Sequence, residues 1–330
     1  MLLTGITITG IPLIRLLPGW YALSRNSRNT PALELIDYIG NTPMVKLRKL
    51  PPSSANVFVK LEYMNPTGSH KDRIALYMIK DAVERYGLKA GDVVVEASSG
   101  NTAISVAFVS KFYGLRPVIV VEEETSSEKV SMLKLLGAEV VFSSRDPSSP
   151  RYYVRVAEAI AKECGGVFLN QFENPANVRA HYETTAREIW QALGGEISAF
   201  VMGVGTGGTI TGVGRFLKER LSEVKVIAVV PKGSKLVGGS GEEFIDGLAS
   251  KNVYRNFDRT LVDAVIEVTR SEAIDVAKRL IREEGIMAGI SAGANVFASL
   301  LIASSLPAGS NMVTVAPDSA FRYLSTLLRS

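Results

Sequence analysis

The sequence is poor in the residues that build several common kinds of functional site. One cysteine, Cys164, excludes an internal disulfide and any cysteine-rich metal cluster. Two histidines, His70 and His181, make a histidine-rich metal site or a serine-type triad a poor first hypothesis. The 37 Lys and Arg against 33 Asp and Glu give a net charge of +4, with no basic stripe. This charge is small for a nucleic-acid-binding protein, so we expect no nucleic acid, and the scarcity of cysteine and histidine leads us to expect no metal.

Long apolar runs are also missing. No run reaches the ~18 residues that a membrane helix needs, so we expect no membrane partner. The first 23 residues are mostly apolar, but Arg15 and Pro18 interrupt them. No charged side chain precedes Arg15, whereas a secretory signal begins with Lys or Arg. We interpret residues 1–30 as an N-terminal arm that packs on this subunit or on a partner, with a processed or membrane-touching leader as the alternative. The other features of the sequence lead us to expect a cytoplasmic protein.

The 330 residues suggest about two domains at ~150 residues each. From residue 57 onward, short β-branched runs alternate with amphipathic stretches, which is typical of parallel sheets covered by helices on both faces. The predicted strands are Val57–Leu61, Val93–Glu96, Pro117–Val121, Val140–Phe142, Val167–Leu169, Phe200–Val204, Val224–Val230, Val265–Thr269 and Met312–Ala316. The predicted helices include Ile74–Tyr86, Thr102–Tyr113, Val154–Glu163, Ile210–Leu221 and Glu272–Glu284. Nine strands are many for one sheet, so we predict an α/β fold with two parallel-sheet domains.

Glycine, with 29 residues, is more abundant than the roughly 7% of an average protein. Several of these glycines lie in loops that follow predicted strands. In open α/β sheets, ligands bind beyond the carboxyl ends of the strands, where helices begin. The loop Ser98-Ser99-Gly100-Asn101-Thr102 is at such a position and opens a helix. Its free backbone N–H groups favour an anion, although a plain helix N-cap is the alternative interpretation.

A second loop, Gly205-Thr206-Gly207-Gly208-Thr209, also lies between a predicted strand and a helix. Its glycines allow close approach of the backbone to a phosphate, and its threonines add donors. The loop matches neither the P-loop nor the dinucleotide-binding spacing, so the phosphate would belong to something other than a nucleotide. A tight turn is the alternative here. A third loop, Gly289–Ala294, is also a candidate for contact with the ligand, and close packing of helices is the alternative interpretation.

Lys71 is predicted just inside the N-terminus of a helix, where the helix dipole disfavours a cation. A lysine in that place is a candidate for a lowered pKa and for Schiff-base chemistry, while a solvated lysine beside Asp72 and Arg73 is the alternative. A phosphate loop, such a lysine and an anion site at a helix start together indicate a pyridoxal 5'-phosphate enzyme.

From about Leu33 to the end, the sequence resembles the cysteine synthase and cystathionine β-synthase family of fold-type II pyridoxal phosphate-dependent enzymes. The motifs that carry the resemblance are Ile39-Gly40-Asn41-Thr42-Pro43, Asn65-Pro66-Thr67-Gly68-Ser69-His70-Lys71-Asp72-Arg73, Ser99-Gly100-Asn101-Thr102, Gln171-Phe172-Glu173-Asn174-Pro175-Ala176-Asn177, Gly205–Thr209, Gly289–Ala294 and Arg322-Tyr323-Leu324-Ser325-Thr326. The resemblance implies the two-domain fold of the tryptophan synthase β-like type. We expect a smaller mobile domain at 57–165 and a larger cofactor-binding domain at 31–56 and 166–330.

The resemblance also implies a role for each matching residue. Lys71 would form the Schiff base with the cofactor and move the α-proton of the substrate. Asn101 would contact the ring oxygen of the cofactor and Ser291 its pyridine nitrogen. The phosphate would lie on Gly205, Thr206, Gly207, Gly208 and Thr209. The substrate carboxylate would lie on Ser98, Ser99, Gly100, Asn101 and Thr102, with Gln171 assisting.

Three positions depart from the family pattern. His70 stands where the family has an apolar or aromatic residue; we interpret it as a packed or hydrogen-bonded neighbour, the alternative being that it tunes Lys71 or contacts substrate. The stretch Val121–Glu128 carries three consecutive acidic residues, which we expect to be solvated at a helix start. The stretch Val237–Gly241 is expected to line the entrance of the site, within a mobile loop at Lys232–Gly241.

The resulting prediction is a β-replacement enzyme that makes L-cysteine from O-acetylserine or O-phosphoserine and sulfide, through an aminoacrylate intermediate. The alternatives are cystathionine synthesis from serine and homocysteine, a lyase, racemase or specialised β-replacement enzyme, and a non-catalytic protein of the same fold. The expected partners are the amino-acid substrate, sulfide or a thiol, and a second copy of the chain in a homodimer.

Overall fold

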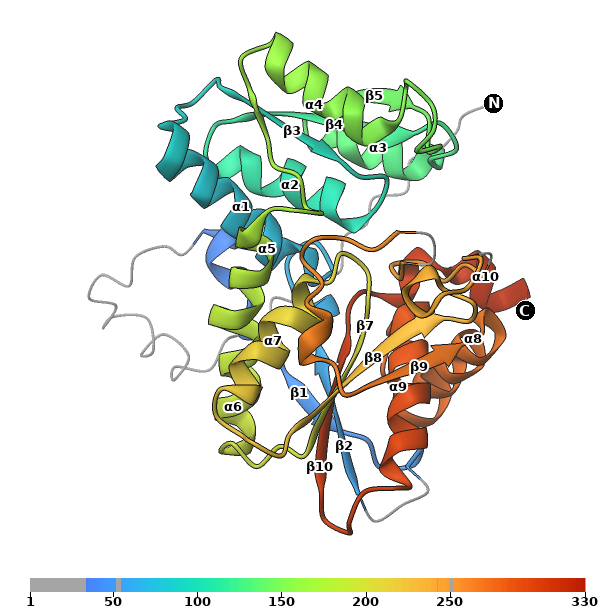
Figure 1. Ribbon diagram of the computed structural model, residues 1–330. Coiled ribbons are helices and arrows are strands. Elements are labelled where there is room, and N and C mark those ends of the chain that lie inside the picture. The colour runs from blue at the N-terminus through green and yellow to red at the C-terminus, as the bar shows by residue number, and fades with distance from the viewer. Residues whose placement is uncertain (1–33, 52–54, 242, 250–251, 330) are drawn as a thin grey trace, which may run out of the picture. The chain divides into compact units, whose positions relative to one another are not determined.

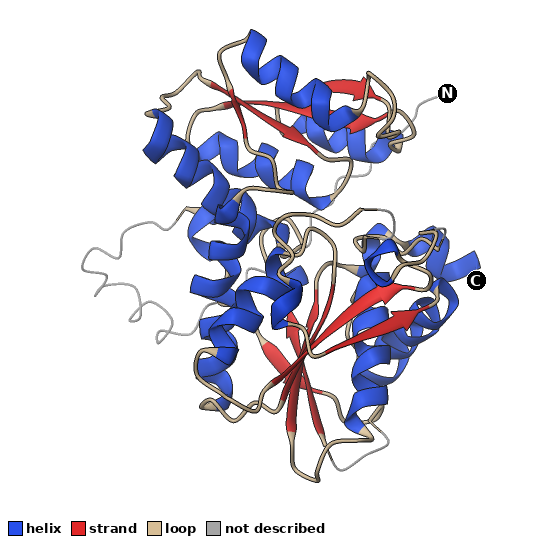
Figure 2. Cartoon of the chain, viewed as in Figure 1, coloured by secondary structure: helices blue, strands red, loops and turns tan. Residues whose placement is uncertain are grey.

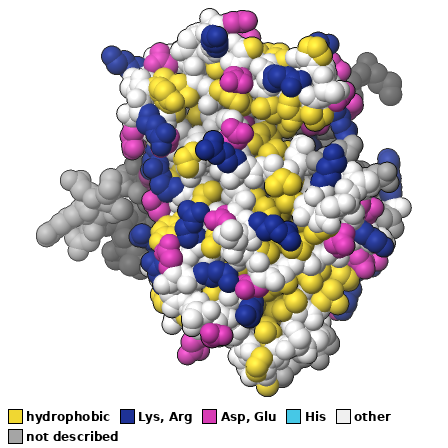
Figure 3. Space-filling view, in the orientation of Figure 1, with side chains coloured by type: hydrophobic (Ala, Val, Ile, Leu, Met, Phe, Trp, Pro, Cys, Tyr) yellow, Lys and Arg dark blue, Asp and Glu magenta, His cyan; other side chains and the backbone are white. Residues whose placement is uncertain are grey.

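The computed structural model describes residues 34–51, 55–241, 243–249 and 252–329 (Figure 1). The predicted N-terminal arm at 1–30 lies outside the described residues. Within the described ranges, no helix combines the length and the apolar character needed to cross a membrane. On the face shown in Figure 3, basic and acidic side chains are interspersed.

The larger sheet has six strands in the order β1-β2-β10-β7-β8-β9. All neighbouring strands are parallel except β1 and β2. The strands are β1 (Met44–Lys46), β2 (Asn56–Leu61), β7 (Ala199–Gly203), β8 (Lys225–Pro231), β9 (Ala264–Val268) and β10 (Asn311–Ala316). Their apolar side chains alternate between two hydrophobic cores, as expected for strands that are buried on both faces.

The smaller sheet has four parallel strands in the order β5-β4-β3-β6. The strands are β3 (Val93–Ala97), β4 (Arg116–Glu122), β5 (Glu139–Ser143) and β6 (Val167–Phe168). Val94 packs into the core on one face, whereas Val95 and Ala97 pack into the core on the other.

Helices cover both faces of each sheet, as Figure 2 shows. They are α1 (Lys71–Tyr86), α2 (Asn101–Phe112), α3 (Ser127–Leu135), α4 (Tyr153–Glu163), α5 (Pro175–Ala180), α6 (Ala186–Leu193), α7 (Gly208–Lys218), α8 (Arg270–Arg279), α9 (Ile290–Ala303) and α10 (Leu324–Arg329). A π-helical turn, η4 (His181–Thr185), joins α5 to α6. The predicted helix at Glu272–Glu284 is α8 followed by a second π-helical turn, η7 (Leu280–Glu284).

All nine predicted strands are present, and the two parallel sheets confirm the predicted fold class. The prediction missed β1, whose three residues are too few for a periodic pattern. Two strands pair differently from the predicted domain boundaries. β2, predicted in the smaller domain, pairs with β10, and β6, predicted in the larger, pairs with β3. Local sequence does not set such pairings, because a β-branched run can pair with many parallel neighbours.

A buried ion network holds the first turn of α1 against the larger sheet. Arg73 lies 2.7 Å from Glu62 and 2.6 Å from Glu188, and Lys60 lies 2.7 Å from Glu188. Burial opposes charge on Glu62, but Arg73 beside it holds the pKa of that carboxyl below its ordinary value. Since Lys71 lies two residues before Arg73, the network also fixes the position of Lys71.

Candidate active site

The predicted loops meet at one place in the structure. Ser98, Ser99 and Gly100 follow β3 directly, and residues 205–207 lie between β7 and α7. A cavity of about 290 Å³ is lined by Lys71, the whole loop 98–102, Gln171, Gly205 and Thr206. A smaller cavity of about 40 Å³ shares Lys71, Asn101, Gly205 and Thr206 with it, and adds Gly207, Thr209 and Ser291. Gly208 lines neither cavity and packs against Asn177.

The glycine loop has the geometry of an anion cradle. Gly207 is the N-cap of α7 and has φ +87°, a left-handed conformation that favours glycine. A Cβ atom on Gly207 would lie 2.5 Å from the Cβ of Phe257, so the packing also requires glycine there. The backbone N–H groups at the start of α7 have no partners within the helix, and the helix dipole favours a negative charge beside them. The amide of Asn177 donates to Thr206 Oγ1 at 3.0 Å, which leaves the hydroxyl proton of Thr206 available.

The loop 98–102 forms a second candidate anion site, at the N-terminus of helix α2. Ser99 Oγ accepts a hydrogen bond from the backbone N–H of Glu122 at 2.7 Å, which ties the loop to β4. Thr102 donates to Gln171 Oε1 at 2.6 Å, and Gln171 Nε2 donates to the carbonyl of Ala97 at 3.2 Å. Gln171 is therefore held at both ends and keeps one amide proton for a ligand.

Lys71 begins α1 and lines both cavities. Burial lowers the pKa of the Lys71 amine to about 8, while the carboxylates of Asp318 and Glu96 act in the opposite direction. The lowered pKa has the direction expected from the sequence, and loss of water on burial is its largest cause. At neutral pH, an appreciable fraction of Lys71 is thus a free amine, the form that reacts with an aldehyde.

Asp318 connects the parts of the site, and the sequence prediction missed it. It is 2% exposed, follows the carboxyl end of β10, and lines the smaller cavity beside Lys71. Its Oδ2 accepts hydrogen bonds from Asn101 Nδ2 at 2.7 Å and from the Tyr323 hydroxyl at 2.6 Å. A carboxylate just after a predicted strand was the signal that could have found it.

Glu96, on β3, is the second missed carboxyl group. It is fully buried and accepts hydrogen bonds from the backbone N–H groups of Ala97 and Gln171. Burial raises the pKa of Glu96 to about 8, although those hydrogen bonds and Lys71 act in the opposite direction. Nothing in the strand pattern of Val93–Glu96 distinguishes this glutamate from a solvated strand end.

An aromatic wall, made of Tyr153, Phe172 and Tyr254, closes one side of the larger cavity. The rings of Phe172 and Tyr254 stack with their centroids 4.4 Å apart, and Tyr153 meets Phe172 edge to face at 6.4 Å. Sequence reasoning missed these three residues as well, because an aromatic residue ordinarily marks a core, and two of them lie in segments without a periodic pattern.

One expectation about the entrance and one about the acidic stretch Val121–Glu128 need correction. The stretch 246–249 lines the larger cavity, whereas in Val237–Gly241 only Gly241 reaches an adjoining cavity of about 400 Å³. In the acidic stretch, Glu123 and Glu124 are exposed as expected, but Glu122 lines the larger cavity. Strand length explains this difference, because β4 extends to Glu122 and its carboxyl end lies at the site.

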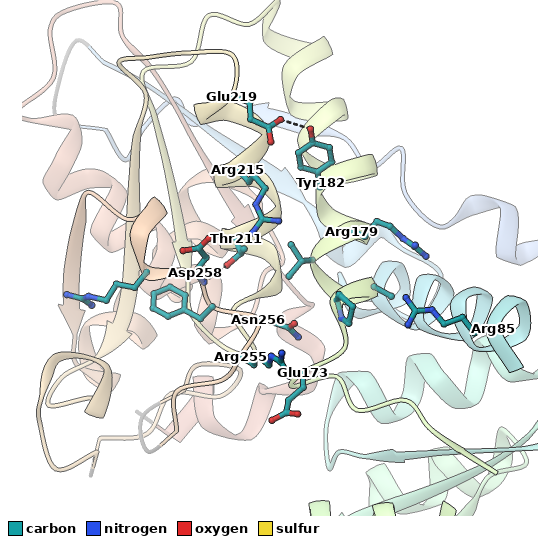
Figure 4. Close-up of a pocket in the computed structure, with 15 residues that line it drawn as sticks. Arg85, Glu173, Arg179, Tyr182, Thr211, Arg215, Glu219, Arg255, Asn256 and Asp258 are labelled. Atoms are coloured by element: carbon teal, nitrogen blue, oxygen red, sulfur yellow. Dashed lines mark hydrogen bonds and ion pairs between the residues drawn. The ribbon is translucent and has the colours of Figure 1, made fainter. Parts of the chain in front are cut away.

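Another cavity, of about 880 Å³, is larger than the two that Lys71 lines but lies elsewhere and contains none of the predicted site residues. As Figure 4 shows, it is lined by side chains of α5, α7 and residues 255–259, among them Arg179, Arg215 and Arg255. Two of its arginines, Arg85 and Arg179, share the carboxylate of Asp81. Cavity size alone therefore does not locate the site in this protein.

The polar groups of the two smaller cavities fit pyridoxal phosphate. Lys71 offers an amine for the aldehyde, and the start of α7 offers donors for the phosphate. Ser291 is 4% exposed, and its hydroxyl makes no hydrogen bond to any part of the chain that the structure describes, so it is open to the ring nitrogen. Asn101 keeps one amide proton for the ring oxygen, since only one is donated to Asp318.

Comparison with known proteins agrees with this fit. Residues 35–318 match the family described as pyridoxal-phosphate dependent enzyme. Cysteine synthase from Staphylococcus aureus (strain N315) is 40% identical over 304 residues, which cover 91% of this chain and 98% of that protein. Cystathionine beta-synthase from Apis mellifera is 39% identical over 88% of this chain, and the match spans 60% of that longer protein.

Solved structures give the same result. The crystal structure of O-ureido-L-serine synthase superposes with a TM-score of 0.86 at 38% identity, covering 91% of this chain and 96% of that one. The chain is therefore an enzyme of the cysteine synthase and cystathionine β-synthase family, whose members have the fold-type II architecture and depend on pyridoxal phosphate.

Proposed function

We propose that this enzyme catalyses β-replacement on an activated serine, O-acetylserine or O-phosphoserine, with sulfide as the nucleophile and L-cysteine as the product. The observation that carries the proposal is the position of Lys71, whose amine has a lowered pKa and lines a cavity between two anion-binding helix starts. Similarity to cysteine synthase over 98% of that protein's length supports it.

In this proposal, the cofactor is held at three points. Gly205, Thr206, Gly207, Gly208 and Thr209 bind the phosphate at the start of α7. Ser291 faces the ring nitrogen and Asn101 the ring oxygen. When bound, pyridoxal phosphate supplies the electron-withdrawing ring that makes the α-proton of an amino acid acidic. A serine hydroxyl need not keep the ring nitrogen protonated, as a carboxylate would, so it favours elimination over a long-lived carbanion.

The substrate carboxylate is proposed to bind the loop 98–102, where the start of α2 favours an anion. This places the α-carbon near Lys71, whose free amine accepts the α-proton and is then a positioned acid. The aromatic wall excludes water from the reacting β-carbon, which protects the reaction from hydrolysis. We also propose that the domain of the smaller sheet is mobile and that the protein is cytoplasmic. A homodimer is proposed as well, and the exposed apolar side chains of Met64, Met287 and Phe321 support it.

The test is a panel of donors. O-acetylserine, O-phosphoserine and serine are each added to the enzyme loaded with cofactor, and the visible spectrum is followed before and after addition of sulfide. One of the two activated serines should change the spectrum, and sulfide should restore it with release of cysteine. A spectrum unchanged by all three donors would show that the proposal is wrong. Turnover only with serine and homocysteine would instead support cystathionine synthesis, as the relative from Apis mellifera suggests.

A further inference from the structure

Both histidines of the chain lie at one hydroxyl group of the proposed phosphate cradle. Thr209 Oγ1 is 3.1 Å from His181 Nε2 and 3.5 Å from His70 Nδ1. On its other side, His181 Nδ1 is 3.0 Å from Thr185 Oγ1. All four side chains are buried, with exposed fractions between 0% for Thr185 and 7% for His70.

The fold brings these groups together from three segments. His181 and Thr185 are the first and last residues of the π-helical turn η4, which places their side chains within hydrogen-bonding distance. Gly212 of α7 allows close approach, since a Cβ atom there would lie 2.9 Å from the Cβ of His181. His70 is fixed by its backbone N–H, which donates to the carbonyl of Pro317 at 2.8 Å.

Burial keeps both rings neutral. It lowers the pKa of His181 to about 3 and holds the pKa of His70 well below its ordinary value. The cationic side chains of Lys71 and Arg73 act in the same direction on both rings, while Glu62 opposes them. A neutral histidine carries one N–H, so each ring can donate one hydrogen bond and accept one.

The direction of each bond depends on which nitrogen of each neutral ring carries the proton, and Thr185 bears on that choice for His181. Thr185 has a hydroxyl proton to donate to His181 Nδ1, which leaves the N–H of that ring on Nε2, facing Thr209. The oxygen of Thr209 has two lone pairs and one proton. We propose that His181 Nε2–H and His70 Nδ1–H fill the two lone pairs, so that the single Thr209 proton is donated to the cofactor phosphate. His70 and His181 are thus positioning residues that act through Thr209, and the inference rests on the proposed place of the phosphate.

The tautomers of the two rings provide a direct test. In the holoenzyme labelled with nitrogen-15, the two histidines give two pairs of ring nitrogen signals, and His70→Phe assigns them. His181 should be neutral at pH 7 with its proton on Nε2, and His70 neutral with its proton on Nδ1. A charged ring, or the opposite tautomer in either ring, would overturn the inference. This readout does not depend on which donor or nucleophile the enzyme uses, so it is separate from the test of the proposed function.

Variants test the role of the hydroxyl group. Thr209→Val should weaken cofactor binding by about 10-fold to 100-fold, the effect of losing one hydrogen bond to a charged group. Thr209→Ser, which keeps the hydroxyl, should bind cofactor within a few-fold of the wild type. Thr185→Val should remove the preference of His181 for the Nε2–H tautomer. Thr184→Val is the matched control and should leave that tautomer unchanged, because the Thr184 hydroxyl donates to the carbonyl of Ala180. Cofactor affinity unchanged in Thr209→Val, or an unchanged tautomer in Thr185→Val, would contradict the inference.

Discussion

Lys71 should react with amine-directed reagents around a midpoint near pH 8, because burial lowers the pKa of its amine from 10.5 to about 8. At pH 7, ~10% of a lysine with that pKa is free amine, against ~0.03% at the ordinary value, a difference of about 300-fold. Only the free amine attacks an aldehyde, so this difference sets how fast the protein takes up its cofactor at neutral pH.

The assay is competitive labelling of the protein, stripped of cofactor, from pH 6 to pH 11, with quantification of each modified lysine by mass spectrometry. The midpoint of the pH profile is compared rather than the absolute rate, so limited access to the cavity does not affect the result. Lys80, exposed on the same helix, serves as the internal reference. A rate at Lys71 that keeps rising through pH 10 without a plateau would refute the burial argument.

Three further variants follow from the same contacts. Asp318→Asn removes a carboxylate that favours the charged amine, so the labelling midpoint of Lys71 should move to lower pH; a move to higher pH would reverse the assigned sign. Arg73→Met leaves the buried carboxylate of Glu62 without its close ion-pair partner and should lower the free energy of unfolding in urea by about 3–5 kcal/mol. Gly207→Ala should lower both the melting temperature and the cofactor affinity, because the added Cβ meets Phe257. Gly233→Ala is the control and should cause smaller losses, because at φ +69° and with no atom within 4 Å its Cβ adds conformational strain alone. Equal losses in the two glycine variants would show that the contact with Phe257 does not matter.

The parts of the site that sequence predicts are those that depend on local geometry. A strand, a glycine-bearing turn and a helix start are encoded in consecutive residues, so the loops at 98–102 and 205–209 and the helix that begins at Lys71 are visible in the sequence. Parallel sheets then bring the carboxyl ends of different strands to one edge, and this explains why separate loops meet at one cavity.

The parts that sequence misses depend on contacts between distant segments. Asp318 gains its importance only because β10 lies between β2 and β7, which brings it to Asn101, 217 residues earlier in the chain. The neutral state of His70 likewise arises from burial against segments far away in sequence. The entrance was assigned to Val237–Gly241 from its resemblance to a glycine-containing family stretch, whereas the backbone path places residues 246–249 at the cavity.

The central claim is that Lys71 carries β-replacement on an activated serine. Its most direct test is the rate of L-cysteine formation from O-acetylserine or O-phosphoserine with sulfide, measured side by side for the wild type and Lys71→Ala, both saturated with pyridoxal phosphate. We predict sustained cysteine formation by the wild type with one of the two donors and none above the protein-free rate by the variant. No cysteine from the wild type with either donor, or equal rates in the two proteins, would contradict the claim.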